Sequence, residues 1–181
     1  MCPFCKSTTI FKKISLFSKI LDKNIIYNLC KKCRSINQED IPDLSEIKKY
    51  YESYIEVKSE MNPGYLSNSN LDSFFNERDK TMREIGFDLV NIVNGTNLEL
   101  GCANGHFLRY LKEHKATDIT GIDISQRLLD SIDIEGVKLL LGDLSLISPS
   151  SVDNLFLFNV LEHIDDIDKT LKEVVRITKD S

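Results

Sequence analysis

The stretch that most constrains the fold is an apolar segment that ends in a run of small residues. Residues 98–108 read LELGCANGHFL, in which Gly101, Ala103 and Gly105 follow a strand pattern and precede a helix pattern. Small side chains allow a tight turn and let a ligand approach the backbone closely. The first turn of a helix offers unpaired N–H groups, which favour a carboxylate or phosphate group. The sequence therefore predicts a site for an anionic or nucleoside-bearing cofactor between a strand and a helix.

Strand and helix patterns alternate from this turn onward. Strands are predicted at residues 98–101, 119–123, 137–141 and 152–158. Helices are predicted at 105–114, 126–132 and 165–178. Alternation at such short spacing is typical of parallel strands joined by crossover helices. We therefore predict an α/β fold, with a parallel sheet and flanking helices.

Two details separate this pattern from a dinucleotide-binding domain. A GxGxxG fingerprint that starts at Gly101 would need its third glycine at the position of His106. The acid at Asp123 follows the second strand and occurs in both kinds of domain, whereas the acid at Asp143 follows the third strand and favours a different cofactor.

Four short motifs in this order and spacing resemble those of the class I S-adenosylmethionine-dependent methyltransferases. They are Glu99–Gly105, Gly121–Ser125, Gly142–Asp143 and Phe158–Ile164. The resemblance covers residues 98–178 closely and corresponds to the N-terminal half of the catalytic domain. It implies a Rossmann-like parallel sheet, of which strands 1–4 are present, and S-adenosylmethionine as the cofactor.

The resemblance assigns cofactor contacts to the ends of the strands. It implies that the first turn holds the methionine moiety, that Asp123 accepts hydrogen bonds from both ribose hydroxyls, and that Asp143 accepts one from the adenine amino group. Ile124 would pack on the adenine, with Leu144 beside the ring. The cofactor-contacting residues that it implies are Glu99, Gly101, Ala103, Gly105, Asp123, Ile124, Asp143, Leu144 and Asn159.

By the same resemblance, the segment from Asn159 to His163 would lie below the reactive methyl group and face the acceptor. A sulfonium methyl group is already activated, so the protein has mainly to align the nucleophile of the acceptor with it. Where that nucleophile carries a proton, His163 is the first candidate base, because a histidine transfers protons near neutral pH. Glu162 and His106 are the alternatives, and a structural role for His163 stays open.

The resemblance also implies a longer sheet than this sequence provides. The resemblance implies a sheet of seven strands. This sequence ends at Ser181, after the helix that follows the fourth strand. The apolar strand 152–158 would then lie at a sheet edge, where it could pair with another chain. Three interpretations remain open: a fragment, a split enzyme completed by a second chain that supplies the C-terminal strands, and an inactive remnant.

Two cysteine pairs near the N-terminus have the spacing of metal-binding knuckles. Cys2 and Cys5 form one CxxC pair, and Cys30 and Cys33 form a second after 24 intervening residues. Four thiolates suit tetrahedral Zn²⁺ and leave no open coordination position, so the zinc would be structural. A thiol redox pair and an iron–sulfur site are the alternatives. The segment resembles the zinc ribbons that precede some small-molecule and RNA methyltransferases.

Charge is divided unevenly along the chain. Residues 1–34 carry a net charge of +7, and the other residues carry −12. One interpretation of the basic segment is a phosphate-bearing partner, either RNA or a nucleotide-linked substrate. The other is partial compensation of the thiolate charges together with docking on the acidic remainder of the chain.

The sequence predicts three parts: a zinc ribbon at 1–40, a helical linker at 41–70 and a methyltransferase domain at 71–181. The boundaries follow the end of the cysteine-containing segment and the start of the long helix that leads into the strand–helix alternation.

Two helices are predicted ahead of the first strand. Apolar residues at helical spacing indicate one helix over 43–61 and another over 71–93, on whose apolar face Arg78 also falls. A stop signal at 62–64 and a polar stretch at 67–70 separate them.

Composition argues against a membrane partner. No apolar run approaches the roughly 20 residues of a spanning helix, and residues 1–5 lack the apolar core of a signal peptide. We therefore expect a cytoplasmic protein, in which the cysteines are metal ligands or free thiols and not disulfides.

Together these patterns predict a methyltransferase that transfers a methyl group to a small metabolite, a sugar or a nucleotide-linked substrate. One alternative is a non-catalytic zinc-ribbon interaction protein with a relic methyltransferase fold. Another is an RNA methyltransferase that binds RNA through the basic ribbon. Glu99, Asp123 and Asp143 favour an enzyme, because a relic has no reason to keep all three acids.

Overall fold

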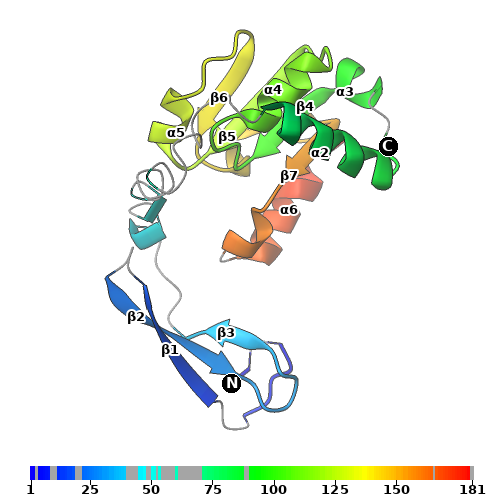
Figure 1. Ribbon diagram of the computed structural model, residues 1–181. Coiled ribbons are helices and arrows are strands. Elements are labelled where there is room, and N and C mark those ends of the chain that lie inside the picture. Colours follow the sequence, from blue (N-terminus) through cyan, green and yellow to red (C-terminus); the bar gives the residue numbers. More distant parts are fainter. Residues whose placement is uncertain are drawn as a thin grey trace. The chain divides into compact units, whose positions relative to one another are not determined.

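The computed structural model describes residues 1–2, 4–8, 12–18, 22–39, 45–47, 50–51, 53, 60, 71–87, 90–164 and 166–179. The chain forms two compact units, Met1–Tyr54 and Ile55–Ser181 (Figure 1). Of the helix predicted over 43–61, the described residues are helical. The stop signal at 62–64 and the polar stretch at 67–70 lie outside the described residues.

The N-terminal unit is built on a small antiparallel sheet in the order β1-β2-β3. Its strands are β1 (Lys12–Ser18), β2 (Lys23–Leu29) and β3 (Ile36–Gln38). The register pairs Lys12 with Leu29 at one end of the hairpin and Ser18 with Lys23 at the other. Because Cys30 follows Leu29 directly, both cysteine pairs lie beyond the same end of the hairpin.

The C-terminal unit contains a parallel sheet in the order β6-β5-β4-β7. The strands are β4 (Thr96–Leu100), β5 (Asp118–Asp123), β6 (Val137–Leu141) and β7 (Asn154–Leu157). This arrangement confirms the predicted α/β fold with parallel strands and flanking helices. The two central strands are buried, and they carry the buried polar residues Asn97, Glu99, Thr120 and Asp123 among their apolar ones.

Helices and short 3₁₀ turns connect these strands. They are α2 (Leu71–Glu84), α3 (Val90–Asn94), α4 (His106–Glu113), α5 (Gln126–Asp130), α6 (Ile167–Ile177), and the turns η2 (Leu144–Leu146) and η3 (Leu161–His163). Every strand–helix pair predicted after residue 98 is present, with ends shifted by a few residues.

The single helix predicted over 71–93 is wrong, because the chain breaks after α2. Gly86 adopts a left-handed conformation with φ of 69°, and its N–H donates to the Arg83 carbonyl over 3.1 Å. The N–H of Phe87 donates to the Met82 carbonyl over 2.9 Å. This glycine-terminated helix end leaves Ile85 68% exposed, although its spacing from Met82 would place it on the apolar face of a continuous helix.

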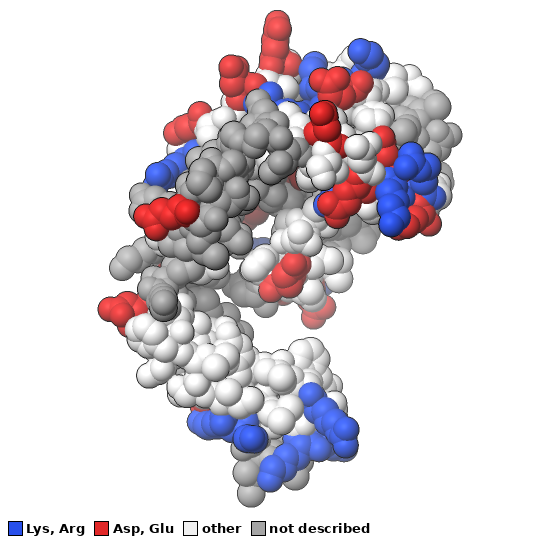
Figure 2. Space-filling view, in the orientation of Figure 1, with Lys and Arg blue, Asp and Glu red and all other residues white. Residues whose placement is uncertain are grey.

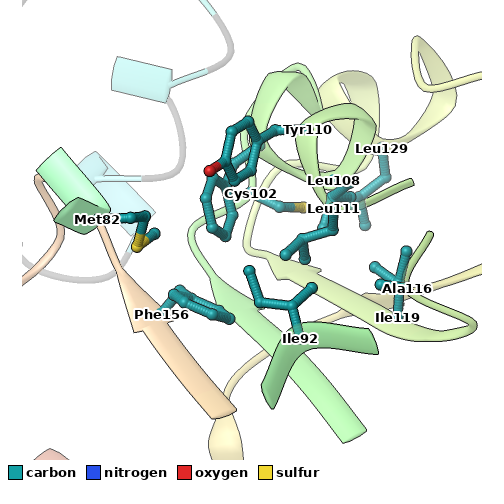
Figure 3. Packing of buried hydrophobic residues seen from close by; sticks show 11 residues of the cluster. Met82, Ile92, Cys102, Leu108, Tyr110, Leu111, Ala116, Ile119, Leu129 and Phe156 are labelled. Atoms are coloured by element: carbon teal, nitrogen blue, oxygen red, sulfur yellow. The ribbon is translucent and has the colours of Figure 1, made fainter. Parts of the chain in front are cut away.

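Two core clusters lie on the two faces of the sheet. The first core cluster gathers side chains from α2, α3, α4, α5 and the strands, and Figure 3 shows Met82, Ile92 and Phe156 meeting within it. The second core cluster lies under α6 and η2 and includes Leu98, Ile122, Leu144, Val152 and Ile177.

Only part of the predicted apolar side of α6 is buried. Ile177 is fully buried in the second core cluster, and Val174 packs against that cluster. Ile167, Leu171 and Val175 are 43%, 47% and 75% exposed, and their spacing of four residues places them along one face of the helix.

Gly121 allows α4 to approach β5 closely. A Cβ atom on Gly121 would lie 2.7 Å from Leu108 Cδ1 and 2.9 Å from Cys102 Sγ, so no larger residue fits without movement. Cys102 is itself buried and belongs to the first core cluster. No helix within the described ranges has the length and apolar character needed to cross a membrane.

A buried amide joins the start of β4 to its neighbours. Asn97 is fully buried, and its Nδ2 donates to the carbonyls of Ile92 and Gly95 over 2.8 Å and of Asp118 over 3.2 Å. Its Oδ1 accepts from Asn154 Nδ2 over 3.1 Å. One side chain thus links α3, β4, β5 and β7.

We expect Asn97→Ala to lower the free energy of unfolding by about 2–4 kcal/mol, because it leaves several buried carbonyl groups without a donor. Asn154→Ala removes one of the four bonds and should cost about 1 kcal/mol. Urea denaturation followed by circular dichroism measures both changes. Equal losses for the two variants would contradict the junction role of Asn97.

Candidate functional site

The predicted cofactor residues meet at the carboxyl edge of the parallel sheet. From β4 the chain continues to β5 and β6 on one side, whereas β7 pairs on the other side. α4 packs in the first core cluster and α6 in the second, so they cover opposite faces. In sheets of this kind, the crevice where the strand order reverses is the usual ligand site.

The turn after β4 is held by backbone hydrogen bonds to β5. The N–H groups of Gly101 and Cys102 both donate to the Ile122 carbonyl, over 2.7 and 3.0 Å. Gly101, Ala103 and Gly105 have φ angles of 72°, 47° and 74°. Glycine adopts such left-handed angles at low cost, which explains two of the three small residues.

Side chains of the chain itself occupy the space into which a Cβ on either glycine would point. A Cβ on Gly101 would lie 2.6 Å from Val160 Cγ2, and one on Gly105 would lie 3.1 Å from Ile132. The small residues therefore admit the chain's own side chains at these two points.

Asp123 connects the turn after β4 with the start of α5. Its Oδ2 accepts from the Ala103 N–H and its Oδ1 from the Ser125 N–H, both over 2.9 Å. Ser125 in turn caps α5 through a hydrogen bond from the Leu128 N–H. Each carboxylate oxygen has two lone pairs, so both oxygens can accept a further hydrogen bond from a ligand. Burial raises the pKa of Asp123.

Glu99 is a second buried acid, and it lies on β4, which pairs with the strand that carries Asp123. It stands next to the C-terminal end of β4 and is 5% exposed, and its Oε2 has no hydrogen-bond partner among the described residues. Burial, and to a smaller degree the charge of Asp123, raises the pKa of Glu99 well above its usual 4.5, while Arg78 opposes this shift. An unsatisfied buried carboxylate indicates a missing donor.

Arg78 of α2 lies close enough to influence Glu99 and is held between two aromatic rings. Its Cζ is 5.0 Å from the centroid of Phe74 and 4.6 Å from that of Phe158. Its Nε is buried and has no hydrogen-bond partner among the described residues. From the sequence, Arg78 was predicted only as part of a helix face. Its charge on an otherwise apolar face was the one sign in the sequence that it could have a role in the site.

The acid after β6 is arranged differently. Asp143 is exposed, and its Oδ1 accepts from the Ser145 N–H and hydroxyl over 2.9 and 2.5 Å. The Ser145 hydroxyl is the main cause that lowers the pKa of Asp143. Leu144 is buried in the second core cluster, and Ile124 is half-buried beside Asp123 in the chain.

The loop after β7 carries the residues expected to face the acceptor. Asn159 is exposed with φ of 54°. His163 is exposed in η3, where its N–H donates to the Val160 carbonyl over 2.9 Å. His106, the alternative base, is half-buried, with Nε2 3.2 Å from Asn104 Nδ2. Burial, followed by Arg109, lowers the pKa of His106, which favours its neutral form.

The four cysteines of the N-terminal unit come together as predicted. Their sulfur atoms all lie within 4.8 Å of one another, with Cys2 Sγ 3.7 Å from Cys33 Sγ and Cys5 Sγ 3.7 Å from Cys30 Sγ. Zn–S bonds of about 2.3 Å in a tetrahedron place sulfur atoms about 3.8 Å apart. The donor set therefore fits a zinc ion, and Cys102 takes no part in it.

Hydrogen bonds favour the thiolate form of two of the four cysteines. The backbone N–H of Cys5 and the hydroxyl of Ser35 lower the pKa of Cys2 to about 6. The Ser35 hydroxyl also lowers the pKa of Cys33, from which it lies 3.1 Å. At Cys5 a backbone hydrogen bond from Ser7 is outweighed by burial and the neighbouring thiols, which raise the pKa to about 11. Thiolates are the form that binds a metal ion.

The parallel sheet with flanking helices gives the C-terminal unit a Rossmann-like fold. Residues 98–181 match the sequence model of the family described as "Methyltransferase domain". This segment therefore has the fold of the S-adenosylmethionine-dependent methyltransferases. No curated protein sequence matches the chain.

Solved methyltransferase structures are similar to part of the chain. An S-adenosylmethionine-dependent methyltransferase from Archaeoglobus fulgidus is 17% identical over 71% of this chain and 54% of its own, with a TM-score of 0.51. One from Mesorhizobium loti is 22% identical over 49% of this chain and 44% of its own, with a TM-score of 0.46. The chain thus spans about half the length of these structures.

We expect the buried Glu99 to make stability depend on pH. Its raised pKa means that the folded state holds the proton more tightly than the unfolded state. Stability from this group is therefore present at low pH and lost as pH rises above 4.5 through the folded-state pKa. Glu99→Gln should gain stability relative to the wild type with rising pH, by up to about 1 kcal/mol per pH unit.

Urea denaturation at pH 5 and pH 8 measures this change. Glu113→Gln is the matched control, because Glu113 is exposed on α4 and should show a difference that does not vary with pH. A difference between Glu99→Gln and wild type that stays constant with pH would contradict the assignment.

Proposed function

We propose that the C-terminal unit binds S-adenosylmethionine at the carboxyl edge of β4 and β5 and serves methyl transfer to an acceptor beside the loop after β7. The observation that carries the proposal is the pair of buried carboxylates, Glu99 and Asp123, at the ends of adjacent strands. Glu99 Oε2 lacks a hydrogen-bond partner among the described residues, and both Asp123 oxygens can accept a further hydrogen bond. This suits a ligand that brings hydroxyl donors and positive charge, as this cofactor does. The match of residues 98–181 to the methyltransferase family supports it.

Asp123 is the residue we assign to the ribose. Its two oxygens are held by the N–H groups of Ala103 and Ser125, which fix the direction of the remaining lone pairs. Two neighbouring hydroxyls of a ribose match a carboxylate that presents two oxygens side by side.

Glu99 and Arg78 are the residues we assign to the amino-acid end of the cofactor. A methionine moiety carries an ammonium and a carboxylate group, which are complementary to a buried carboxylate and a guanidinium group. Glu99 Oε2 and Arg78 Nε both lack a hydrogen-bond partner among the described residues. Packing between Phe74 and Phe158 holds the guanidinium group in place for this contact.

The acceptor side of the site is assigned to Asn159–His163. S-adenosylmethionine supplies an activated methyl group, so these residues have only to orient the acceptor and, where needed, take its proton. His163 is the base that we propose, since its exposed position in η3 leaves it accessible to an acceptor. The acceptor class we propose is a small metabolite, a sugar or a nucleotide-linked compound.

Calorimetric titration tests the proposal. We expect the zinc-loaded chain to bind both S-adenosylmethionine and its demethylated product, and Asp123→Ala to lose this binding because the ribose contacts are gone. Asp130→Ala is the control, since Asp130 is an exposed acid on α5. A folded sample that gives no heat with either ligand would sink the proposal.

A second pair of variants tests the amino-acid end. Arg78→Gln should weaken binding of S-adenosylmethionine by about tenfold or more, because a charge-assisted hydrogen bond is lost. It should leave the weaker binding of adenosine, which lacks the amino-acid end, unchanged. Arg83→Gln, in an exposed position on the same helix, should change neither. Equal losses for both ligands would show that Arg78 acts on the fold and not on the methionine moiety.

We further propose that Cys2, Cys5, Cys30 and Cys33 hold one structural zinc ion. The tetrahedral spacing of the sulfurs supports this assignment, and a zinc ion with four thiolate ligands has no coordination position left open. The unit is small, so the metal would supply much of its folding free energy.

Metal analysis of the purified chain should give one zinc per chain. Cys30→Ser should lose the ion and the β-sheet signal of the N-terminal unit, whereas Cys102→Ser should keep one zinc per chain because Cys102 lies outside the cluster. Full zinc retention by Cys30→Ser would contradict the four-sulfur site.

A further inference from the structure

The two cysteine knuckles share one backbone geometry. The Cys2 N–H donates to the Ser7 carbonyl and the Cys30 N–H to the Ser35 carbonyl, both over 2.9 Å. In each knuckle, the residue after the second cysteine has a left-handed backbone: φ is 56° at Lys6 and 60° at Arg34. These residues therefore occupy equivalent positions on two turns that the sulfur cluster brings together.

Glycine or asparagine is the usual residue at such a left-handed position. Here both positions carry long basic side chains, and both are exposed. A long side chain at a position where the left-handed backbone costs energy points to a use for that side chain.

Other basic residues surround this pair, and together they define the knuckle tip. Lys31 and Lys32 lie between Cys30 and Cys33, and Lys12 begins β1 opposite Leu29. The tip residues Lys6, Lys12, Lys31, Lys32 and Arg34 are all exposed. Figure 2 shows blue side chains gathered toward the end of the N-terminal unit at which the knuckles lie.

The two knuckle segments contain no acidic residue of their own. Residues 1–8 and 30–36 contain neither Asp nor Glu. Glu39 pairs with Lys13 over 2.6 Å, and Asp22 lies at the opposite end of the hairpin, next to β2. A Zn²⁺ ion with four thiolates contributes −2, so the five basic residues of the knuckle tip leave it with a net charge of about +3.

An exposed aromatic ring lies in the same place. Phe4 sits inside the first knuckle and is 68% exposed. A phenyl ring among basic side chains is the combination that binds single-stranded nucleic acid: the ring stacks on a base, and the cations contact the phosphates. Met1 and Ile36 are also exposed in the same segments. Three such side chains form a small apolar surface, whereas binding in a membrane interface uses the long apolar face of an amphipathic helix.

We propose that the knuckle tip binds single-stranded nucleic acid, with a base stacked on Phe4 and phosphates contacted by Lys31, Lys32 and Arg34. This function is separate from the methyl transfer proposed above, because it uses only the N-terminal unit. The measurements below contain no S-adenosylmethionine, so their outcome is distinguishable from that of the cofactor titrations.

Fluorescence anisotropy of a labelled 12-nucleotide single-stranded RNA, with the zinc-loaded full chain, tests the charge contribution. Affinity should fall with salt, with a log–log slope near −2 for three phosphate contacts, since each contributes about −0.7. The triple variant Lys31→Gln, Lys32→Gln, Arg34→Gln should lose at least about tenfold in affinity and most of this slope. The control variant Lys80→Gln, Lys138→Gln, Lys172→Gln removes the same charge from the exposed surface of the C-terminal unit and should retain the slope.

A second pair of variants tests the contribution of stacking to RNA binding. Phe4→Ala should weaken RNA binding by about tenfold and leave the salt slope unchanged. Phe17→Ala removes a ring that is 60% exposed at the other end of β1, and it should have no effect. Equal effects of the two variants would show that the ring at the tip does not stack on a base.

Amide chemical shifts locate the contact without any substitution. Titration with the RNA should perturb residues 4–8 and 30–36, and single-stranded DNA of the same sequence tests whether the 2′-hydroxyl matters. The proposal is overturned if perturbations fall on the C-terminal unit, or if the triple variant and its control bind equally. It is also overturned if the tip binds vesicles of anionic phospholipid but not the oligonucleotides.

Discussion

The pairing of β4 on both of its edges is the constraint on which the C-terminal unit depends. Glu99 lies opposite Gly121 on one side and Phe156 on the other, and its side chain is buried. Burying such a group is costly unless something compensates it. The position of β4 therefore places a buried acid, which is costly to the fold when nothing compensates it, beside the crevice at which a cofactor can bind.

The strands and most helices could be predicted because their signals are local. Alternating apolar runs mark β4, β5, β6 and β7, and short turns leave few ways to connect them. The break after α2 was missed because Met82 and Ile92 enter the same core cluster from two separate helices. Their apolar spacing continues across the break, and only Gly86 signals it.

The candidate site was predictable to the extent that its residues lie at strand ends. Glu99, Asp123 and Asp143 reach one edge because parallel strands end there together. The roles of Arg78 and Val160 could not be predicted, because they depend on contacts between residues far apart in sequence. Arg78 meets Phe158 only after α2 has packed beside the end of β7.

The hydrogen bonds of Asp123 have a consequence for the energetics of binding. The N–H groups of Ala103 and Ser125 donate hydrogen bonds to its carboxylate. The turn after β4 and the start of α5 are therefore ordered before any ligand binds. A ligand would then lose its own freedom but would not have to organise the receptor. The heat capacity change on binding would accordingly reflect the ligand surface that is buried and little refolding of the protein.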